Sequence, residues 1–120
     1  MKTILVVDDQ SDIRRLLRIA LMRDFNIVEA EDAEQALAAI ATSAPDLILL
    51  DVMMPGDLDG LDVLKRLKAD AQLKHIPVAM VTARGQLSDT QDATLLGADA
   101  YFVKPFSPIQ VSAWVRERLG

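Results

Sequence analysis

The feature that most constrains the fold of this chain is a run of four large apolar residues, Leu47–Leu50, that ends in the acid Asp51. Apolar residues at every position, rather than at alternate positions, are typical of a strand that is covered on both faces, as in a parallel sheet. Turn residues follow at once, so Asp51 is predicted at the carboxyl end of a central strand. Open α/β sheets bind their ligands at that edge. For a single aspartate the simpler interpretation is an acid that ends a strand, so its function depends on the residues that it meets.

Strand and helix patterns alternate along the rest of the chain. Apolar and β-branched runs predict strands at residues 3–7, 25–30, 47–51, 78–82 and 100–104. Apolar residues at helical spacing predict helices at residues 13–21, 33–43, 60–71, 89–96 and 108–119. Five strands that alternate with five helices predict an α/β fold, a doubly wound five-stranded parallel sheet with right-handed crossovers and helices on both faces.

Three of the predicted helices carry further signals. Asp32 and Gln35 have the spacing of a capping box. Ser107 followed by Pro108 is a typical helix start, and Trp114 is expected in the core. The first helix has an apolar face and, opposite it, arginines that are most simply a solvated surface. The apolar face consists of Ile13, Leu16, Leu17, Ala20 and Leu21, and the arginines are Arg14, Arg15 and Arg18.

Composition limits the class of protein. A chain of 120 residues that is 51% hydrophobic can bury the core of one domain, so residues 1–120 are expected to form a single unit. There is no cysteine for disulfides or thiolate metal sites, and we find neither a signal peptide nor a run long enough to span a membrane. A cytoplasmic protein is therefore expected. The net charge of −5, without a basic block, argues against direct nucleic-acid binding and suits a cation.

Polar residues follow four of the five predicted strands. They are Asp8, Asp9, Asp51, Thr82 and Lys104. Because the carboxyl ends of parallel strands meet at one edge, these residues are expected to lie close together. Clustered carboxylates repel one another, which raises the pKa of at least one of them unless a cation neutralises the charge. Oxygen ligands without histidine or cysteine favour a hard ion such as Mg²⁺, and the lone His75 precedes a strand at the opposite edge.

Such a cluster has the parts of a phosphoryl acceptor. A carboxylate can attack phosphorus to form an aspartyl phosphate, and phosphoryl transfer needs mainly positioning and neutralisation of the phosphoryl oxygens. Mg²⁺ and the Lys104 ammonium would supply positive charge, and the Thr82 hydroxyl would supply a hydrogen-bond donor.

The chain resembles the receiver domain of two-component response regulators over nearly its whole length. Five sequence pieces carry the resemblance: Asp8-Asp9, Asp51-Val52-Met53-Met54-Pro55, Thr82-Ala83, Gly97-Ala98-Asp99-Ala100-Tyr101 and Lys104-Pro105-Phe106. The resemblance implies the flavodoxin-like strand order 2-1-3-4-5 and a cis peptide before Pro105. It also implies a signalling domain that is not an enzyme, since it catalyses only its own phosphorylation and dephosphorylation.

The same resemblance implies a role for each site residue. Asp51 accepts a phosphoryl group from a histidine kinase or a histidine phosphotransfer protein, with acetyl phosphate as an alternative donor. The implied direct Mg²⁺ ligands are Asp9, Asp51 and the backbone carbonyl of Met53. Asp8 is implied to bind the ion mainly through water. Thr82 and Lys104 hold the phosphoryl oxygens. Thr82 then moves toward the phosphate and Tyr101 turns inward, which makes this pair a two-state switch for partner binding.

Partners and departures from the family pattern follow from the same comparison. The implied partners are the kinase or phosphotransfer protein and an output domain or downstream target. A monomer or a weak phosphorylation-dependent dimer is expected, because no basic residue between Gln86 and Tyr101 is available for a charged dimer interface.

Gly60 comes nine positions after Asp51 instead of the usual eight, which leaves the shape of that loop open. Met53 and Arg84 flank the site and by analogy tune the lifetime of the phosphate.

Three alternatives share this fold or its chemistry. A flavin-binding protein would need a phosphate-cradling loop after the first strand, where residues 8–12 are acidic instead. An Mg²⁺-dependent aspartyl-phosphate hydrolase would need a second acid two residues after its nucleophile, where Met53 stands. A phosphorylation-independent scaffold or interaction module would not need the site residues that are present.

Overall fold

The structure is a computed structural model that describes residues 1–83 and 97–120. Five strands form one parallel sheet in the order β2-β1-β3-β4-β5. The strands are β1 (Thr3–Val7), β2 (Asn26–Ala30), β3 (Leu47–Asp51), β4 (Val78–Ala83) and β5 (Ala100–Lys104). The described helices are α1 (Ser11–Leu21), α2 (Ala33–Thr42), α3 (Gly60–Ala69) and α5 (Pro108–Leu119). The predicted doubly wound, flavodoxin-like sheet is thereby confirmed.

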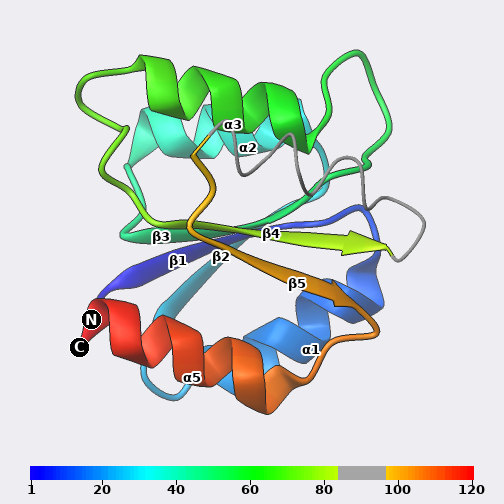
Figure 1. Ribbon diagram of the computed structural model, residues 1–120, viewed down its shortest axis with the longest axis vertical. Helices are drawn as coiled ribbons and strands as arrows, with labels where there is room; N and C mark the ends of the chain where they lie inside the picture. The colour runs from blue at the N-terminus through cyan, green and yellow to red at the C-terminus, as the bar shows by residue number, and fades with distance from the viewer. Residues whose placement is uncertain (84–96) are drawn as a thin grey trace.

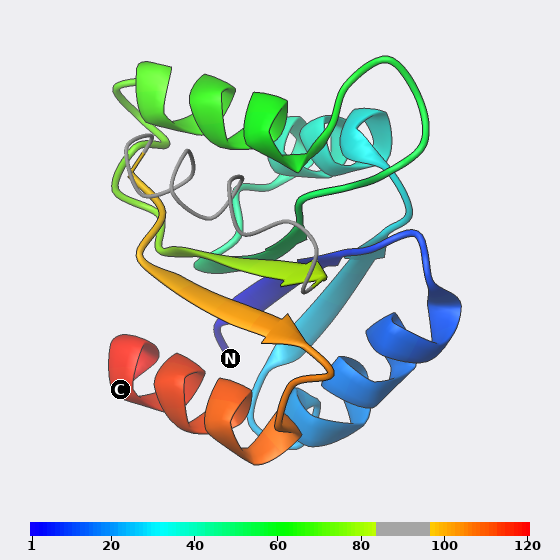
Figure 2. The same ribbon diagram turned by 45° about the vertical axis from the view of Figure 1, so that its right-hand side comes forward.

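The sheet lies between two layers of helices. In Figure 1, α2 and α3 cover its upper face, and α1 and α5 cover its lower face. The view turned by 45° shows the same two layers (Figure 2). This arrangement leaves the edge at the carboxyl ends of the strands to the loops that follow them.

Side-chain alternation divides the core between the two layers. Ile48 and Leu50 of β3 pack against α2 and α3, whereas Leu47 and Leu49 pack against α1 and α5. Every residue of β3, including Asp51, is buried. Helices cover both faces of β3, which explains why this strand is apolar at every position from Leu47 to Leu50, as the sequence suggests.

The described helices are short, with 10 to 12 residues each, and side-chain caps define the starts of α2, α3 and α5. At α3, the Asp59 carboxylate accepts a hydrogen bond from the Asp62 amide and the Asp62 carboxylate accepts one from the Asp59 amide. At α2, Asp32 accepts from the Gln35 amide as predicted, but the Gln35 side chain accepts from the amide of Glu31 rather than that of Asp32. Within residues 1–83 and 97–120, no helix is long and apolar enough to cross a membrane.

The C-terminal helix begins as the sequence predicts. Ser107 is its N-cap, with Pro108 as the first helical residue, and the Ser107 hydroxyl accepts a hydrogen bond from the amide three residues further on, at Gln110. Trp114 is half-buried at the border of the core, where its ring meets Phe102 edge-on with centroids 6.1 Å apart. The peptide bond before Pro105 is cis, as the family resemblance implies.

Several element boundaries differ from the sequence predictions. The predicted helix at 89–96 lies outside the described residues. The third helix ends at Ala69 rather than at residue 71, because Asp70 leaves the helical conformation and its carboxylate accepts a hydrogen bond from the amide of Gln72. The second strand begins at Asn26 rather than at 25, and the fourth continues to Ala83 rather than ending at 82.

One predicted core residue lies at the surface. Leu16 is 41% exposed, whereas Leu17 and Leu21 are fully buried. Successive residues of a helix are turned by about 100° from one another, so Leu16 lies at the edge of the row that Leu17 and Leu21 form. The prediction that Leu16 is buried was therefore wrong, although the rest of that face packs as expected.

Candidate functional site

The register of the central strands brings the two acidic segments together. Val7 of β1 lies opposite Leu50 of β3. Asp8 and Asp51 each follow one of these residues, so the two aspartates come side by side at the carboxyl edge of the sheet. Both side chains are buried, while Asp9, one residue further along the loop, is exposed.

The residues from β4 and β5 divide between the two faces of the sheet. Phe102 packs on the side of α1 and α5, so Lys104, two positions further, continues that row. Met80 packs on the side of α2 and α3, and Thr82 continues its row; Tyr101 packs on this side as well. Thr82 and Tyr101 therefore share one face of the sheet, while Lys104 approaches the acids from the other.

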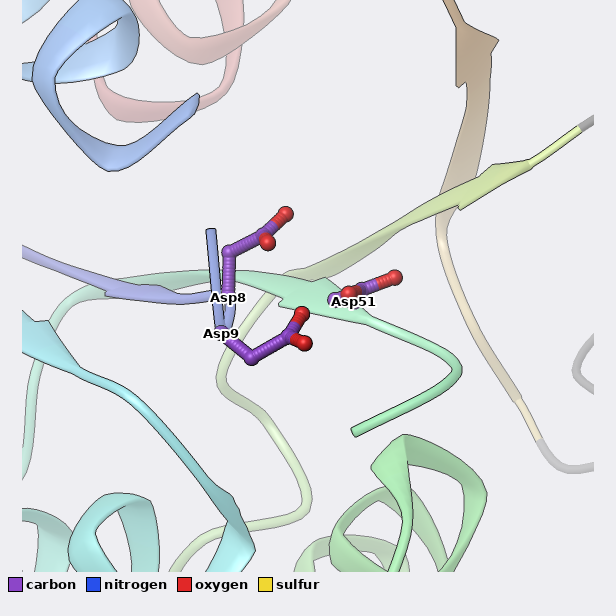
Figure 3. Close-up of side chains that lie close together, drawn as sticks. All are labelled: Asp8, Asp9 and Asp51. Carbon is purple, nitrogen blue, oxygen red and sulfur yellow. The ribbon is translucent and has the colours of Figure 1, made fainter. Parts of the chain in front are cut away.

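Three carboxylates form the centre of the site. One oxygen from each of Asp8, Asp9 and Asp51 lies within 4.8 Å of the others. Figure 3 shows the three side chains around the ends of β1 and β3. An all-oxygen set of this kind, with two buried carboxylates and an exposed one, has the donor chemistry of a Mg²⁺ site that keeps several waters. The residues therefore fit the metal that the sequence suggests.

Lys104 holds the acids together. Its ammonium lies 2.8 Å from a carboxylate oxygen of Asp8 and 3.6 Å from one of Asp51. It also donates a hydrogen bond of 3.1 Å to the side-chain carbonyl of Gln10. The other carboxylate oxygen of Asp8 accepts from the backbone amide of Gln10 at 2.9 Å. Asp8 is thus held on both oxygens, and the lysine bridges β5 to β1 and β3.

Burial and charge shift the ionisation of this cluster. The pKa of Asp51 is raised from its ordinary value of 3.8 to about 7, mainly by burial and then by the charge of Asp8, while the Lys104 ammonium opposes both. Burial alone would lower the pKa of Lys104, but its hydrogen bond to Asp8 and the charges of Asp51 and Asp8 raise that pKa above its ordinary value. The pKa of one acid, Asp51, is thus raised as expected, although burial contributes more than the neighbouring carboxylates.

The other predicted site residues occupy defined places. Thr82 is fully buried, and its hydroxyl lies 3.4 Å from the carbonyl oxygen of Ala83. Tyr101 is half-buried, opposite Met80 in the sheet. Met53 lies in the loop after β3 with its side chain 58% exposed. Arg84 lies outside the described residues, and His75 is exposed at the opposite edge, as expected.

Gly60 explains part of the loop that the sequence left open. The glycine begins α3, and its amide donates a 2.8 Å hydrogen bond to the carbonyl of Val52. A Cβ atom at this position would overlap the backbone carbonyl of Asp51. The first turn of α3 can therefore pack against the backbone of the central acid only because residue 60 has no side chain.

Sequence reasoning missed the roles of two residues. Gln10 was interpreted only as part of a turn, yet its side chain contacts Lys104 instead of capping α1. Arg14 was interpreted as part of a solvated face, which is wrong, because its side chain is 11% exposed and donates to the carbonyl of Asp8 at 2.7 Å. One sequence signal could have indicated that Arg14 is partly buried: it directly follows Ile13, so it lies at the border of the apolar face of α1.

Comparisons with known proteins agree with this geometry. The chain is 44% identical over 113 residues to the phosphate regulon transcriptional regulatory protein PhoB of Pseudomonas aeruginosa, which covers 93% of this chain and 49% of PhoB. A putative response regulator from Chloroflexus aurantiacus superposes with a TM-score of 0.91 at 32% identity, over 98% of this chain and 97% of that one. The receiver domain of NtrX from Brucella abortus superposes with a TM-score of 0.88 at 36% identity, over 97% of each chain.

The fold and the acidic edge, taken with these similarities, define a small α/β signalling domain. The chain belongs to the response regulator receiver domain family, which matches residues 4–116. It is homologous to the phosphoacceptor domains of two-component response regulators. The chain spans about half the length of the curated relatives it matches.

Proposed function

We propose that Asp51 of this receiver domain accepts a phosphoryl group from a histidine kinase or a histidine phosphotransfer protein in a Mg²⁺-dependent reaction. One observation carries the proposal. Carboxylate oxygens of three aspartates lie within 4.8 Å of one another, and the Lys104 ammonium lies 3.6 Å from Asp51. A nucleophile, a metal site and a fixed positive charge thus meet at one edge of the sheet.

The proposed metal ligands are Asp8, Asp9, Asp51 and the backbone carbonyl of Met53. Mg²⁺ bound there would neutralise the crowded carboxylates and the oxygens of an incoming phosphoryl group. Asp8 is held by Lys104 and by the Gln10 amide, so its carboxylate is positioned before any ion arrives. The exposed Asp9 lies where an ion can enter from solvent.

Asp51 acts as the nucleophile in this proposal. An oxygen of its ionised carboxylate attacks the phosphorus of a phosphohistidine, and the phosphorus–nitrogen bond breaks as the imidazole nitrogen leaves with the bonding electrons. The raised pKa of Asp51 reflects the cost of keeping a second buried charge beside Asp8. The Lys104 ammonium already lies near both acids, so it is placed to form an ion pair with a phosphoryl oxygen once Asp51 is phosphorylated.

Thr82 and Tyr101 are the proposed switch. Both lie on the side of the sheet that α2 and α3 cover, and Thr82 follows the residue opposite Asp51. A hydrogen bond from the Thr82 hydroxyl to the phosphoryl group would draw this residue toward Asp51, and the half-buried Tyr101 ring would fill the space that it leaves. Phosphorylation would then change the surface around β4 and β5, where partners could detect it.

The experiment that tests the proposal measures covalent phosphorylation. The chain is incubated with acetyl phosphate and Mg²⁺, and its intact mass is followed by electrospray mass spectrometry. One phosphoryl group is expected on the wild type and on Asp57→Asn, a matched exposed acid of the same loop, and none on Asp51→Asn or in the presence of EDTA. A wild type that stays unlabelled with acetyl phosphate and with a phosphorylated histidine donor would instead favour the scaffold alternative.

The hydrolase alternative has a separate test. Its acid–base position is occupied by Met53, whose exposed thioether cannot transfer a proton. Such an enzyme would release phosphate from added phosphomonoesters with repeated turnover, whereas a receiver would yield one labelled aspartate per chain. Release of many equivalents of phosphate by the wild type would contradict the receiver proposal.

The wider biological setting stays a prediction. We propose that residues 1–120 act as one receiver unit in the cytoplasm, as a monomer or a weak phosphorylation-dependent dimer. Its partners would be the phosphodonor protein and an output domain or downstream protein target, with no direct binding of nucleic acid or membrane by this unit. The similarity to regulators about twice as long supports an attached output domain.

A further inference from the structure

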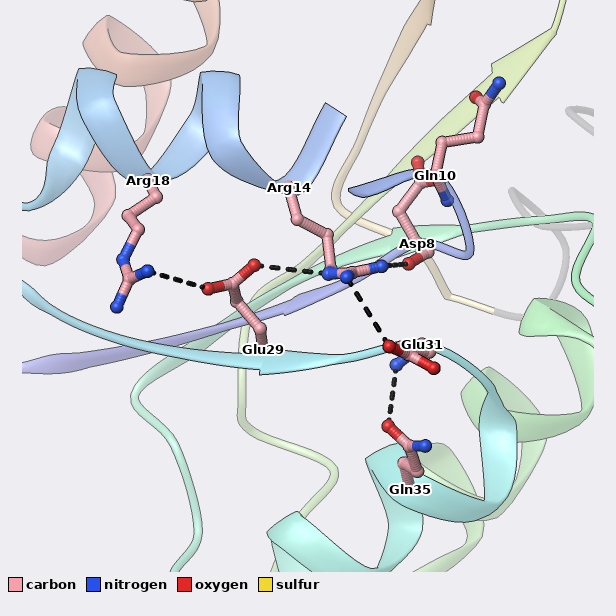
Figure 4. A network of polar contacts seen from close by, with 7 residues as sticks. All are labelled: Asp8, Gln10, Arg14, Arg18, Glu29, Glu31 and Gln35. Carbon is pink, nitrogen blue, oxygen red and sulfur yellow. Dashed lines mark hydrogen bonds and ion pairs between the residues drawn. The ribbon is translucent and has the colours of Figure 1, made fainter. Parts of the chain in front are cut away.

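An arginine outside the proposed phosphorylation site contacts the backbone that carries two of its acids. Arg14 of α1 donates a hydrogen bond of 2.7 Å from its Nη1 to the carbonyl oxygen of Asp8. Its Nε lies 3.1 Å from Glu29 at the end of β2, and its Nη2 lies 3.7 Å from Glu31. Figure 4 shows the guanidinium between the Asp8 loop and these two glutamates.

The acceptor of this bond is significant. The carbonyl of Asp8 belongs to the peptide unit whose amide is that of Asp9, and the atoms of a peptide unit lie in one plane. A bond to that oxygen therefore sets the orientation of the plane that joins the two acids. The preceding amide, that of Asp8, is held as well, by a 3.1 Å hydrogen bond to the carbonyl of Ala30.

We propose that Arg14, held by Glu29 and Glu31, is a positioning residue that orients the Asp8–Asp9 peptide for divalent-cation binding. The planar guanidinium can bond to the carbonyl and to the glutamates at the same time, in directions that a lysine ammonium on a flexible stem cannot reproduce. This inference rests on the proposed metal site of Asp8, Asp9 and Asp51, and it adds a residue from outside that site.

Simple electrostatics makes the opposite prediction, which sharpens the test. Arg14 is a cation close to a cation site, so its removal would strengthen Mg²⁺ binding if only its charge mattered. If Arg14 orients the peptide, its removal weakens Mg²⁺ binding. A role confined to tying α1 to β2 would lower the stability of the fold and leave the affinity of the folded protein unchanged.

The same helix offers a matched control. Arg18 also pairs with Glu29, at 3.3 Å, but its side chain is 53% exposed. In the contacts of the described part of the chain, Glu29 is its only ion-pair partner, and Figure 4 shows it on the far side of Glu29 from Asp8. Arg18→Ala therefore removes one positive charge and one bond to Glu29 while leaving the Asp8 carbonyl bond in place.

The test is a Mg²⁺ titration by isothermal titration calorimetry on the wild type, Arg14→Ala, Arg14→Lys and Arg18→Ala, with ¹⁵N–¹H spectra of the metal-free proteins. Arg14→Ala is expected to bind Mg²⁺ about 10-fold more weakly, as is common when a group that orients a metal ligand is lost. Arg14→Lys, which keeps the charge, should also bind more weakly, and Arg18→Ala should stay within about twofold of the wild type. The Asp9 amide resonance should move in both Arg14 variants and not in Arg18→Ala.

The possible results distinguish the positioning role of Arg14 from the proposed Mg²⁺ site itself. Folded Arg14→Ala and Arg14→Lys proteins that bind Mg²⁺ as tightly as the wild type, or more tightly, would overturn the inference. An equal loss in Arg18→Ala would also overturn it, since that variant keeps the carbonyl bond. If Arg14→Ala does not fold, the folded Arg14→Lys protein decides alone. A wild type that binds no Mg²⁺ would contradict the proposed function itself, which is a distinct outcome.

Discussion

At the scale of single residues, the acidic edge of this receiver domain holds a buried acid, Asp51, whose charged form is disfavoured. Asp51 is almost fully buried and stands beside Asp8, and Lys104 is the cation that pairs with it among the residues that the structure describes. Its pKa of about 7 describes the protein without a metal. Under the proposed function, the same burial that makes ionisation costly also makes a bound cation effective, because charges attract more strongly where water is excluded.

This raised pKa predicts a pH-dependent stability. Between about pH 4 and 7 the folded metal-free chain holds a proton on Asp51 that the unfolded chain has lost, so the stabilisation from that proton is present at low pH and disappears as the pH rises through 7. Asp51→Asn removes this effect. The variant is therefore expected to gain free energy of unfolding relative to the wild type as the pH rises from 5 to 8, with a slope of at most about 1.4 kcal/mol per pH unit.

Urea unfolding in EDTA at several pH values measures that difference. Asp57→Asn, at an exposed position of the same loop, is the control and should show a constant offset from the wild type. A constant offset for Asp51→Asn as well would mean that Asp51 ionises normally in the folded protein.

At the scale of secondary-structure elements, the start of α3 sets the loop behind Asp51. Gly60 packs against the backbone carbonyl of Asp51. Asp59, directly before it, exchanges two hydrogen bonds with Asp62 in a capping box. Asp59, the N-cap of α3, and Gly60, which contacts the backbone of Asp51, are therefore neighbours in sequence. The capping interaction anchors the end of the loop that also contains Met53.

Loss of this cap should destabilise the domain measurably. Asp59→Ala removes the hydrogen bond that the Asp59 carboxylate accepts from the Asp62 amide, while the backbone amide of residue 59 can still donate to Asp62. The variant is expected to lower the free energy of unfolding by about 1 kcal/mol. Asp57→Ala changes the net charge by the same amount at an exposed position two residues earlier, and it should change that free energy by less than about 0.5 kcal/mol. Chemical denaturation at fixed pH measures both, and equal losses in the two variants would argue against a specific capping effect.

At the scale of the whole molecule, the surface around α5 is already paired within the chain. The arginines of its last turn form ion pairs with other elements, Arg116 with Asp24 at 2.8 Å and Arg118 with Asp99 at 3.1 Å. Asp99 also accepts a hydrogen bond from the amide of Val78, so it ties the start of β5 to β4. Charges that are satisfied internally contribute less to a contact with a second copy.

A monomer is therefore expected in the absence of a phosphodonor. Sedimentation velocity at micromolar concentration should give one species with the mass of a single chain, 13.2 kDa. Addition of beryllofluoride and Mg²⁺, which imitates phosphorylation, should leave it monomeric or produce a weak, concentration-dependent dimer. A tight dimer without any phosphoryl mimic would contradict this expectation.

The sequence by itself was sufficient for the order of the elements and for the list of residues at the acidic edge. An unbroken apolar strand, alternating strand and helix patterns and polar residues after the strands are local signals, and parallel topology brings the strand ends together whatever the details of packing. Asp8, Asp51, Thr82 and Lys104 could therefore be assigned to one edge from their positions alone.

The tertiary structure alone decided which side chains meet and from which face. Arg14 and Arg18 look alike in the sequence and both pair with Glu29, yet only Arg14 reaches the carbonyl of Asp8, because Arg18 lies about one helical turn further along α1 from the Asp8 loop. Likewise, no local pattern shows that Lys104 contacts Gln10, or that residue 60 must lack a side chain beside Asp51. The contact of Lys104 with Gln10 joins residues 94 positions apart, and even the contacts between residues closer in sequence join different elements. Their geometry depends on strand register and helix packing, which arise only when the whole sheet is assembled.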